Sequence, residues 1–264
     1  MSKSLLLVSL FCLATSAAQA AVIADEVTYK ANGTTLKGFL AYDNAIKGKR
    51  PGVLVVHEWW GLNDYTRKRA IMLAELGYTA LALDMYGNGK HAEHPDDAAK
   101  FSAVLNKNMP LAKARFDAGV HLLRKQKTVD PGEIAAIGYC WGGGVALNMA
   151  RMGENLKGVA TFHGALTTDI PAKPGKVKAR IVSFTGDDDP FVPADKVAAF
   201  KEEMEKAGAN FRVVTYPGAR HAFTNPEADE LAKKFNLPFA YDEAADKDSW
   251  QQLTVFLREV FARK

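Results

Sequence analysis

Short apolar runs and amphipathic stretches alternate along most of this chain. Apolar runs typical of buried strands span Val53–His57, Tyr78–Leu83, Ile134–Ile137, Val159–Phe162, Arg180–Phe184 and Phe211–Tyr216. Helical spacing is found in Asp64–Leu76, Asp97–Asn106, Leu111–Lys125, Gly143–Arg151, Ala194–Lys206 and Lys247–Ala262. This alternation predicts an α/β fold, a doubly wound and mostly parallel sheet with helices on both faces. Its chemistry is then expected in the loops beyond the carboxyl ends of the strands.

A β-hairpin is expected to open the domain. The alternating segments Glu26–Lys30 and Thr35–Tyr42 are joined at Asn32-Gly33, a dipeptide typical of tight hairpin turns. Residues 21–264 have the length of one α/β domain, and Pro171–Lys178 is interpreted as a surface loop rather than a linker.

The first twenty residues have the pattern of a secretory signal peptide. Lys3 precedes an apolar stretch from Leu5 to Ala14, and Ala18-Gln19-Ala20 supplies small residues before a cleavage point. We therefore expect cleavage after Ala20 and a periplasmic or secreted protein. The apolar stretch is shorter than the roughly 20 residues of a membrane span, so no membrane partner is expected.

The charge of the chain argues against one class of partner, nucleic acid. The chain carries 34 Lys and Arg against 30 Asp and Glu, a formal charge of +4 that is spread without basic clusters. This distribution does not favour nucleic acid as a partner. We expect a monomer that acts on a small molecule.

The most informative local pattern surrounds Cys140, which is the only cysteine outside the predicted signal peptide. It stands in Gly138-Tyr139-Cys140-Trp141-Gly142, between an apolar run and a predicted helix. In such a nucleophile elbow, the flanking glycines remove side chains that would collide in a strained turn. A buried cysteine of purely structural role is the alternative. However, an unpaired thiol in an oxidising compartment is open to irreversible oxidation, so its presence favours a chemical use.

A nucleophilic thiol needs a base, and the base needs a carboxylate to orient it. Both residue types follow Cys140 in the order nucleophile, acid, base. The acids Asp187, Asp188 and Asp189 come after the strand ending at Phe184, and His221 comes after the strand ending near Tyr216. The residues alone do not distinguish among the three aspartates.

An oxyanion hole requires two backbone N–H groups. Trp141, directly after the nucleophile, is expected to supply one, and Trp59, in the loop after an early strand, is the candidate for the other. Beside it, Glu58 places a carboxylate at the end of an apolar strand, where it needs a partner.

Together these segments resemble the dienelactone hydrolase (carboxymethylenebutenolidase) family, the cysteine branch of the α/β-hydrolase fold. The matching motifs are His57-Glu58-Trp59-Trp60-Gly61, Gly138-Tyr139-Cys140-Trp141-Gly142-Gly143, Gly186-Asp187-Asp188-Asp189-Pro190-Phe191-Val192-Pro193 and His221-Ala222-Phe223. The resemblance implies that Cys140 is the nucleophile, His221 the base and Asp189 the orienting acid. It also implies that Glu58 holds the resting thiol. The implied reaction is hydrolysis of an ester or lactone through an acyl-thiol intermediate, without cofactor or metal.

The chain departs from the family pattern at the substrate carboxylate. Dienelactone hydrolases grip this group with two arginines, which are not evident at the corresponding positions here, around Asp84–Lys90 and Thr224–Asn225. Lys90 and Arg220 are candidate substitutes, although a lysine lacks the bidentate fork of arginine. Trp60 and Tyr86 are further candidates for contact with substrate. An anionic dienelactone is therefore not the expected natural substrate.

Two other functions compete with a hydrolase. A thiol redox protein would also use an exported cysteine, but no resolving cysteine accompanies Cys140. A non-catalytic small-ligand-binding module would use a cleft lined by Trp59, Trp60, Tyr86 and Trp141, and the complete set of nucleophile, acid and base argues against it.

Three histidines outside this set have simpler interpretations. His91 and His94 are spaced so that both could face one metal ion, but the following Pro95-Asp96-Asp97 favours a surface loop and a helix cap. His163 ends a predicted strand, where we expect a structural role.

Overall fold

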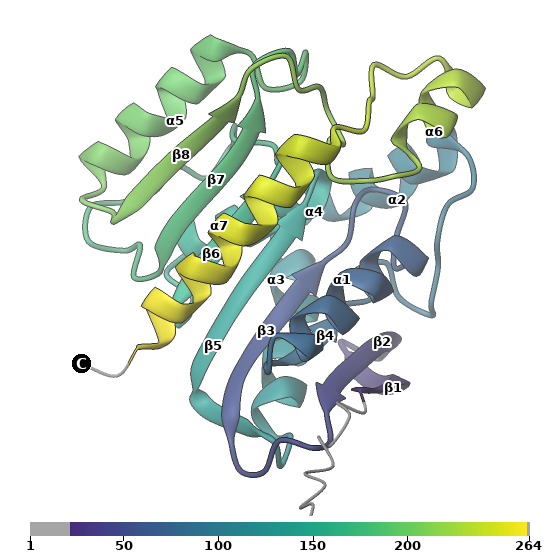
Figure 1. Ribbon diagram of the computed structural model, residues 1–264, viewed down its shortest axis with the longest axis vertical. Helices are drawn as coiled ribbons and strands as arrows, with labels where there is room; N and C mark the ends of the chain where they lie inside the picture. The colour runs from purple at the N-terminus through teal and green to yellow at the C-terminus, as the bar shows by residue number, and fades with distance from the viewer. Residues whose placement is uncertain (1–21, 263–264) are drawn as a thin grey trace, which may run out of the picture.

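The computed structural model describes residues 22–262, so the predicted signal peptide, residues 1–20, lies outside the described residues. One eight-stranded sheet runs through the molecule in the order β1-β2-β4-β3-β5-β6-β7-β8 (Figure 1). Its strands are β1 Val22–Ala31, β2 Thr34–Asp43, β3 Arg50–Val56, β4 Thr79–Ala82, β5 Val129–Tyr139, β6 Gly158–Phe162, β7 Arg180–Gly186 and β8 Phe211–Tyr216. The pairs β1/β2 and β2/β4 are antiparallel, and β4, β3, β5, β6, β7 and β8 run parallel. The predicted doubly wound sheet and its opening hairpin are confirmed.

The hairpin turn has the geometry that its sequence predicts. Asn32 and Gly33 have φ values of 46° and 79°, so both central residues adopt the left-handed conformation of the turn that suits twisted strands. β2 then pairs with β4, which attaches the hairpin to the parallel part of the sheet.

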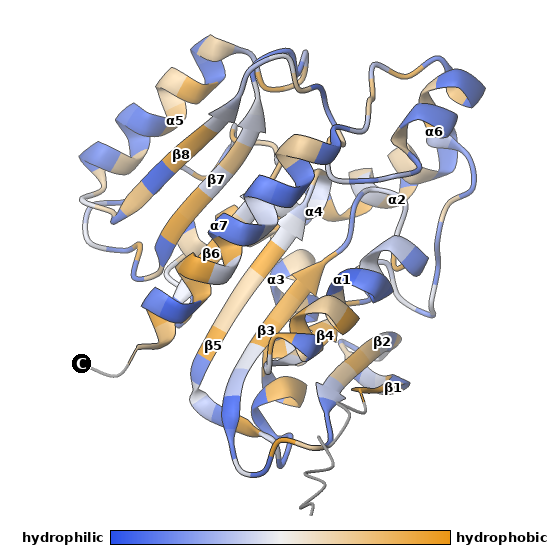
Figure 2. Ribbon diagram, in the orientation of Figure 1, coloured by the Kyte–Doolittle hydropathy of each residue, from blue (hydrophilic) through white to orange (hydrophobic). Residues whose placement is uncertain are grey.

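Helices cover both faces of the sheet. They are α1 Asp64–Glu75, α2 Pro95–Asn106, α3 Met109–Arg124, α4 Trp141–Arg151, α5 Ala194–Lys206, α6 Ala228–Phe235 and α7 Glu243–Phe261. α1 and α7 lie on the face turned to the viewer in Figure 1. The sheet divides the core into two layers, one on each face, and alternate residues of β3 point into different layers. Val53 and Val55 belong to the layer with α1 and α7, whereas Leu54 and Val56 belong to the layer with α3, α4 and α5. Figure 2 shows the resulting apolar strands in the middle of the molecule.

Some boundaries differ from the prediction. β5 begins at Val129 rather than Ile134, and α4 begins at Trp141, directly after Cys140. α6 was not predicted, because it spans only eight residues, fewer than the roughly 11 to 18 over which helical periodicity is judged, although its residues are amphipathic. Residues 171–178 form neither helix nor strand and lie mostly exposed, as expected of a surface loop. Within residues 22–262, no helix has the length and apolar character needed to cross a membrane.

Candidate active site

Cys140 occupies a strained elbow between β5 and α4. Its φ of 51° and ψ of −122° lie in a region that side chains rarely adopt, which is typical of functional turns. A Cβ on Gly138 would lie 2.2 Å from the carbonyl oxygen of Gly142, and one on Gly142 would lie 2.3 Å from that of His57. Only glycine fits either position, so the predicted nucleophile elbow is confirmed as a backbone geometry.

The structure brings the predicted acid and base to this thiol. Nε2 of His221 lies 3.1 Å from Sγ of Cys140, and Nδ1 of His221 lies 2.8 Å from Oδ2 of Asp189. Asp187 and Asp188 are exposed, whereas Asp189 is buried, so the geometry selects the aspartate that the sequence alone left open. The three residues follow β5, β7 and β8, whose carboxyl ends meet at one edge of the parallel sheet.

Electrostatics favour a proton on the imidazole. Burial is the largest single influence on His221 and lowers its pKa, but the Cys140 charge and the hydrogen bond to Asp189 together raise that pKa above its usual value. A second hydrogen bond, 2.8 Å from the backbone N–H of Phe191 to Oδ1 of Asp189, fixes the carboxylate. A protonated imidazole at 3.1 Å stabilises negative charge on the sulfur.

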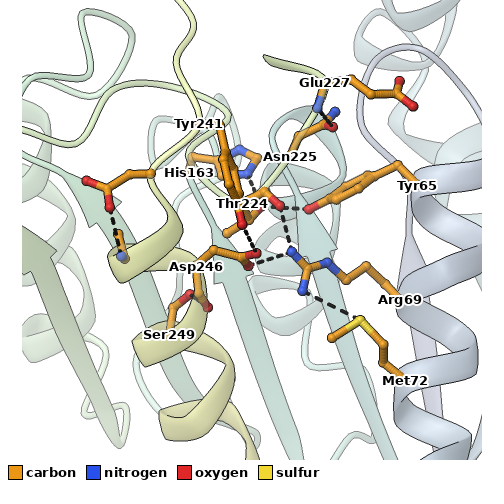
Figure 3. A network of polar contacts seen from close by, with 12 residues as sticks. Tyr65, Arg69, Met72, His163, Thr224, Asn225, Glu227, Tyr241, Asp246 and Ser249 are labelled. Carbon is orange, nitrogen blue, oxygen red and sulfur yellow. Dashed lines mark hydrogen bonds and ion pairs between the residues drawn. The ribbon is translucent and has the colours of Figure 1, made fainter. Parts of the chain in front are cut away.

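The loop that carries His221 is held by a buried polar network (Figure 3). The Thr224 hydroxyl lies 2.6 Å from the hydroxyl of Tyr65 and 2.8 Å from Nε2 of His163. The main-chain oxygen of Thr224 accepts a 2.6 Å hydrogen bond from Arg69. Three residues outside the loop, two from α1 and one that directly follows β6, thus hold Thr224 three residues after the imidazole.

Arg69 links this loop to α7. Its guanidinium forms an ion pair of 2.5 Å with Asp246 and lies 5.2 to 5.5 Å from the ring centroids of Tyr65, Tyr139 and Trp250. The residue is 4% exposed, so the pair operates away from bulk water.

Trp59 and Trp141, the candidates for the oxyanion hole, are supported by the same side chain. The hydroxyl of Tyr86 donates a 2.7 Å hydrogen bond to the carbonyl oxygen of Trp59, and its ring lies 5.3 Å from that of Trp141. His57 packs on the other side, with its ring 4.7 Å from Tyr86 and 5.5 Å from Trp141. Tyr86 therefore fixes the position of both loops.

Cys140 and His221 open into an apolar cavity of about 230 Å³. Its other walls include Trp59, Trp141, Phe191, Val192, Leu237 and Phe239. None of the residues lining this cavity, all within the described part of the chain, is a lysine or arginine. The cavity suits an apolar and uncharged group.

Comparison with known proteins identifies the family. The model of the dienelactone hydrolase family matches residues 36–261. The chain belongs to the dienelactone hydrolase family. Among curated relatives, Protein usf of Aquifex pyrophilus is 29% identical over 239 residues, 88% of this chain and 97% of that protein. A protein of Aquifex aeolicus named "Putative carboxymethylenebutenolidase" is 28% identical over 238 residues, 88% and 96% of the two chains.

Solved structures agree with this assignment. A dienelactone hydrolase-like promiscuous phosphotriesterase from metagenomic libraries superposes with a TM-score of 0.86 and 32% identity, covering 92% of this chain and 100% of that one. The family resemblance and the α/β-hydrolase fold expected from the sequence are thus confirmed, and the protein is a dienelactone hydrolase-like hydrolase.

Glu58 differs from the role implied by the dienelactone hydrolase family. Its carboxylate accepts a 2.8 Å hydrogen bond from Nδ2 of Asn225, whereas the hydrogen-bond partner of the Cys140 thiol is His221. The implied contact between Glu58 and the resting thiol is therefore not the arrangement in this structure. Burial is the main reason why the pKa of Glu58 rises to about 7.

None of the four candidates for substrate contact lines the cavity that contains Cys140 and His221, so a contact between them and substrate stays a prediction. Trp60 is buried behind Trp59, and Tyr86 lies behind Trp59 and Trp141. Lys90 and Arg220 are exposed. Six other wall residues were not proposed as site residues from the sequence. Phe191 and Val192 belong to the acid motif itself, whereas no motif marks the other four, which are Ser102, Ala165, Leu237 and Phe239.

The remaining histidines have structural positions in this family member. His94 is the N-cap of α2, with Nδ1 accepting a 3.3 Å hydrogen bond from the backbone N–H of Asp96. The cap expected at Pro95-Asp96-Asp97 therefore lies earlier, and these three residues form the first turn of the helix. His163 is fully buried, and its ring lies 5.2 Å from that of His221. Among residues 22–262, no cluster of three or more His, Cys, Asp and Glu side chains has the proximity needed to hold a metal ion.

Proposed function

We propose that this hydrolase cleaves an ester or lactone through an acyl-thiol intermediate, with Cys140 as nucleophile, His221 as base and Asp189 as the residue that orients the base. The observation that carries the proposal is a chain of two contacts beside a cavity. Sγ of Cys140 lies 3.1 Å from Nε2 of His221, and Nδ1 of His221 lies 2.8 Å from Oδ2 of Asp189. This is the geometry in which a base activates a nucleophile and a carboxylate fixes the base.

The first half-reaction forms the acyl-enzyme. The Cys140 sulfur attacks the carbonyl carbon while the proton of the thiol resides on Nε2 of His221. The carbonyl oxygen becomes negative and is stabilised by the backbone N–H groups of Trp141 and Trp59. The carbon–oxygen bond to the alcohol then breaks, and His221 gives its proton to the leaving oxygen. In a lactone, the acyl group and the leaving alcohol are parts of one ring, so the alcohol stays attached to the acyl chain that is bound to Cys140.

The second half-reaction releases the acid. His221 removes a proton from water, and the hydroxide attacks the thioester carbonyl. The carbon–sulfur bond breaks, the sulfur leaves as a thiolate beside the protonated His221, and the starting pair of Cys140 and His221 is restored. No electron acceptor or donor takes part, so the reaction differs from that of a redox thiol.

The acyl-enzyme provides the decisive test. Rapid mixing with a p-nitrophenyl ester is expected to give a burst of one p-nitrophenol per active site, and quenched protein should carry the acyl mass on the peptide containing Cys140. Cys140→Ala should lose burst and adduct, and His221→Ala should lose turnover. A non-catalytic binding module would bind the ester and give neither signal, which would contradict the proposal.

We also propose that the protein is exported, on the basis of the pattern in residues 1–20. Mass spectrometry of protein recovered from the expressing cell should give a chain that begins at Ala21. A mature chain that retains Met1 or Ser2 would contradict this proposal.

A further inference from the structure

A second cavity lies directly beside the one that contains Cys140. It has a volume of about 290 Å³ and shares two wall residues, Trp141 and Ala165, with the cysteine cavity. Trp141 thus borders both an apolar space, which contains the thiol, and a neighbouring space of comparable size. Because the two spaces share these residues, one substrate longer than the first cavity is expected to reach both.

The second cavity has apolar walls that include Leu105, Met109 and Val145, together with a set of polar residues of a particular kind. Its polar residues are Asn106, Asn148, Thr167, Thr168 and Asp169, and none of its lining residues, all within the described part of the chain, is a lysine or arginine. It therefore combines amides, hydroxyls and one carboxylate without a positive charge.

Both amide groups are oriented by their oxygens. Oδ1 of Asn106 accepts a 2.8 Å hydrogen bond from Nε1 of Trp141. Oδ1 of Asn148 accepts from the Thr168 hydroxyl at 2.9 Å and from Arg151 at 3.1 Å. Each asparagine therefore retains its NH₂ group as a donor. The carboxylate of Asp169 is an acceptor only.

This combination of groups selects among ligands. An anionic group would lack a cation to pair with and would meet Asp169, and a purely apolar group would leave the amide donors without partners. A hydroxyl group satisfies both kinds of residue, because it accepts from an amide NH₂ and donates to a carboxylate. Asp169 is exposed, so water screens its charge and weakens any preference for a cation.

We propose that this second cavity is a subsite for the uncharged, hydroxylated half of an ester whose apolar half occupies the cavity at Cys140. The inference rests on the proposed function and adds the class of substrate to it. In contrast to the anionic dienelactone, the substrate class is then an aromatic or aliphatic ester with a polyol-like portion.

Two matched pairs of esters test the subsite. Glyceryl benzoate and propyl benzoate differ by hydroxyls in the alcohol half, and phenyl glycerate and phenyl propionate differ by hydroxyls in the acyl half. In at least one pair, the hydroxylated ester is expected to have a kcat/KM about tenfold higher, since two hydrogen bonds of ordinary strength are gained. Equal values in both pairs would overturn the inference, as would a preference for an ester that carries a carboxylate or a quaternary ammonium group.

Two variants test whether the preference for hydroxylated esters arises in the second cavity. Asn148→Asp and Asn106→Asp each keep the accepting oxygen and remove the NH₂ donors. The ratio of kcat/KM for the hydroxylated ester to that for the plain ester should fall severalfold in each. Asn155→Asp makes the same charge change at an exposed residue outside the cavity and should keep the wild-type ratio. A preference that persists in both cavity variants contradicts the assignment.

The proposed function and the subsite fail in different ways. If none of the four esters is hydrolysed, the proposed ester hydrolysis at Cys140 is wrong. The affinity of the esters for the protein then tests the second cavity by itself. Calorimetry with Cys140→Ala should show severalfold tighter binding of glyceryl benzoate than of propyl benzoate, and equal affinity would overturn the subsite.

Discussion

The guanidinium of Arg69 in α1 donates a 2.6 Å hydrogen bond to the main-chain oxygen of Thr224, three residues after His221. The same guanidinium forms an ion pair with Asp246 in α7. One buried cation therefore joins two helices of the same sheet face to the loop that carries the proposed base. Arg69 thus holds the loop that carries His221 against α1 and α7.

Arg69→Met should destabilise the protein by about 3–5 kcal/mol, because it leaves Asp246 and the Thr224 carbonyl without their buried partner. Urea unfolding measures this loss. Lys68→Met, at the adjacent and exposed position of α1, is the control and should change the free energy of unfolding by less than about 0.5 kcal/mol. The double variant Arg69→Met with Asp246→Leu should recover part of the stability. If the double variant is no more stable than Arg69→Met, the ion pair is not the main contribution.

Asp189→Asn should lower kcat/KM for a p-nitrophenyl ester by about 10³ to 10⁴ without loss of fold. The asparagine oxygen can still accept from the Phe191 N–H, but its NH₂ group faces Nδ1 of His221 and selects the wrong tautomer of the imidazole. Asp187→Asn changes an exposed neighbour and serves as the matched control, with near wild-type rates expected. A fall of less than tenfold in Asp189→Asn would remove the orienting role.

Glu58→Gln should change how stability depends on pH. Since burial raises the pKa of Glu58 from 4.5 to about 7, the folded chain retains a proton that the unfolded chain releases between these values. Stability therefore falls as pH rises through this window, by on the order of 3 kcal/mol, and stays lower above it. Glutamine accepts from Asn225 without ionising, so the variant should gain stability over the wild type between pH 5 and pH 8.

Urea unfolding of both proteins at pH 5 and pH 8 checks this expectation. Glu230→Gln, an exposed change in α6, should show the same pH dependence as the wild type. A stability difference between Glu58→Gln and the wild type that is the same at both pH values would show that Glu58 ionises normally.

Gly142→Ala should destabilise the elbow by about 3 kcal/mol, because the added methyl group meets the carbonyl oxygens of His57 and Val56 at 2.3 and 2.5 Å. Gly132→Ala is the matched control, since its nearest neighbour, Oδ1 of Asp130, lies at an ordinary 3.6 Å. Thermal unfolding compares the two variants. Similar melting temperatures would mean that the backbone at the elbow can shift to admit a side chain.

Local patterns were sufficient to predict which loops come together. Cys140, the run Asp187–Asp189 and His221 each follow a strand of a parallel sheet, and parallel strands bring their carboxyl ends to one edge whatever the intervening sequence. The choice of Asp189 within that run came from the family resemblance and not from the pattern. The elbow was predictable for a related reason, as its glycines are required by contacts within a few residues and with the neighbouring strand.

Contacts between distant segments were not predictable in this way. Asn225, the partner of Glu58, lies 167 residues further along the chain, and only the folded structure shows which buried carboxylate meets which amide. Leu237 and Phe239 reach the cavity wall because of the path of the chain after α6, a helix of only eight residues. Lys90 and Arg220 were chosen for charge, but no charge alone determines which way an exposed side chain points.

The shared indole between the two cavities has an optical consequence. Trp141 borders both cavities and donates its N–H to Asn106, so its emission is expected to respond to a ligand in either one. Trp59 lines only the cysteine cavity, so a change in fluorescence that persists after Trp59→Phe would report on Trp141 without any added label.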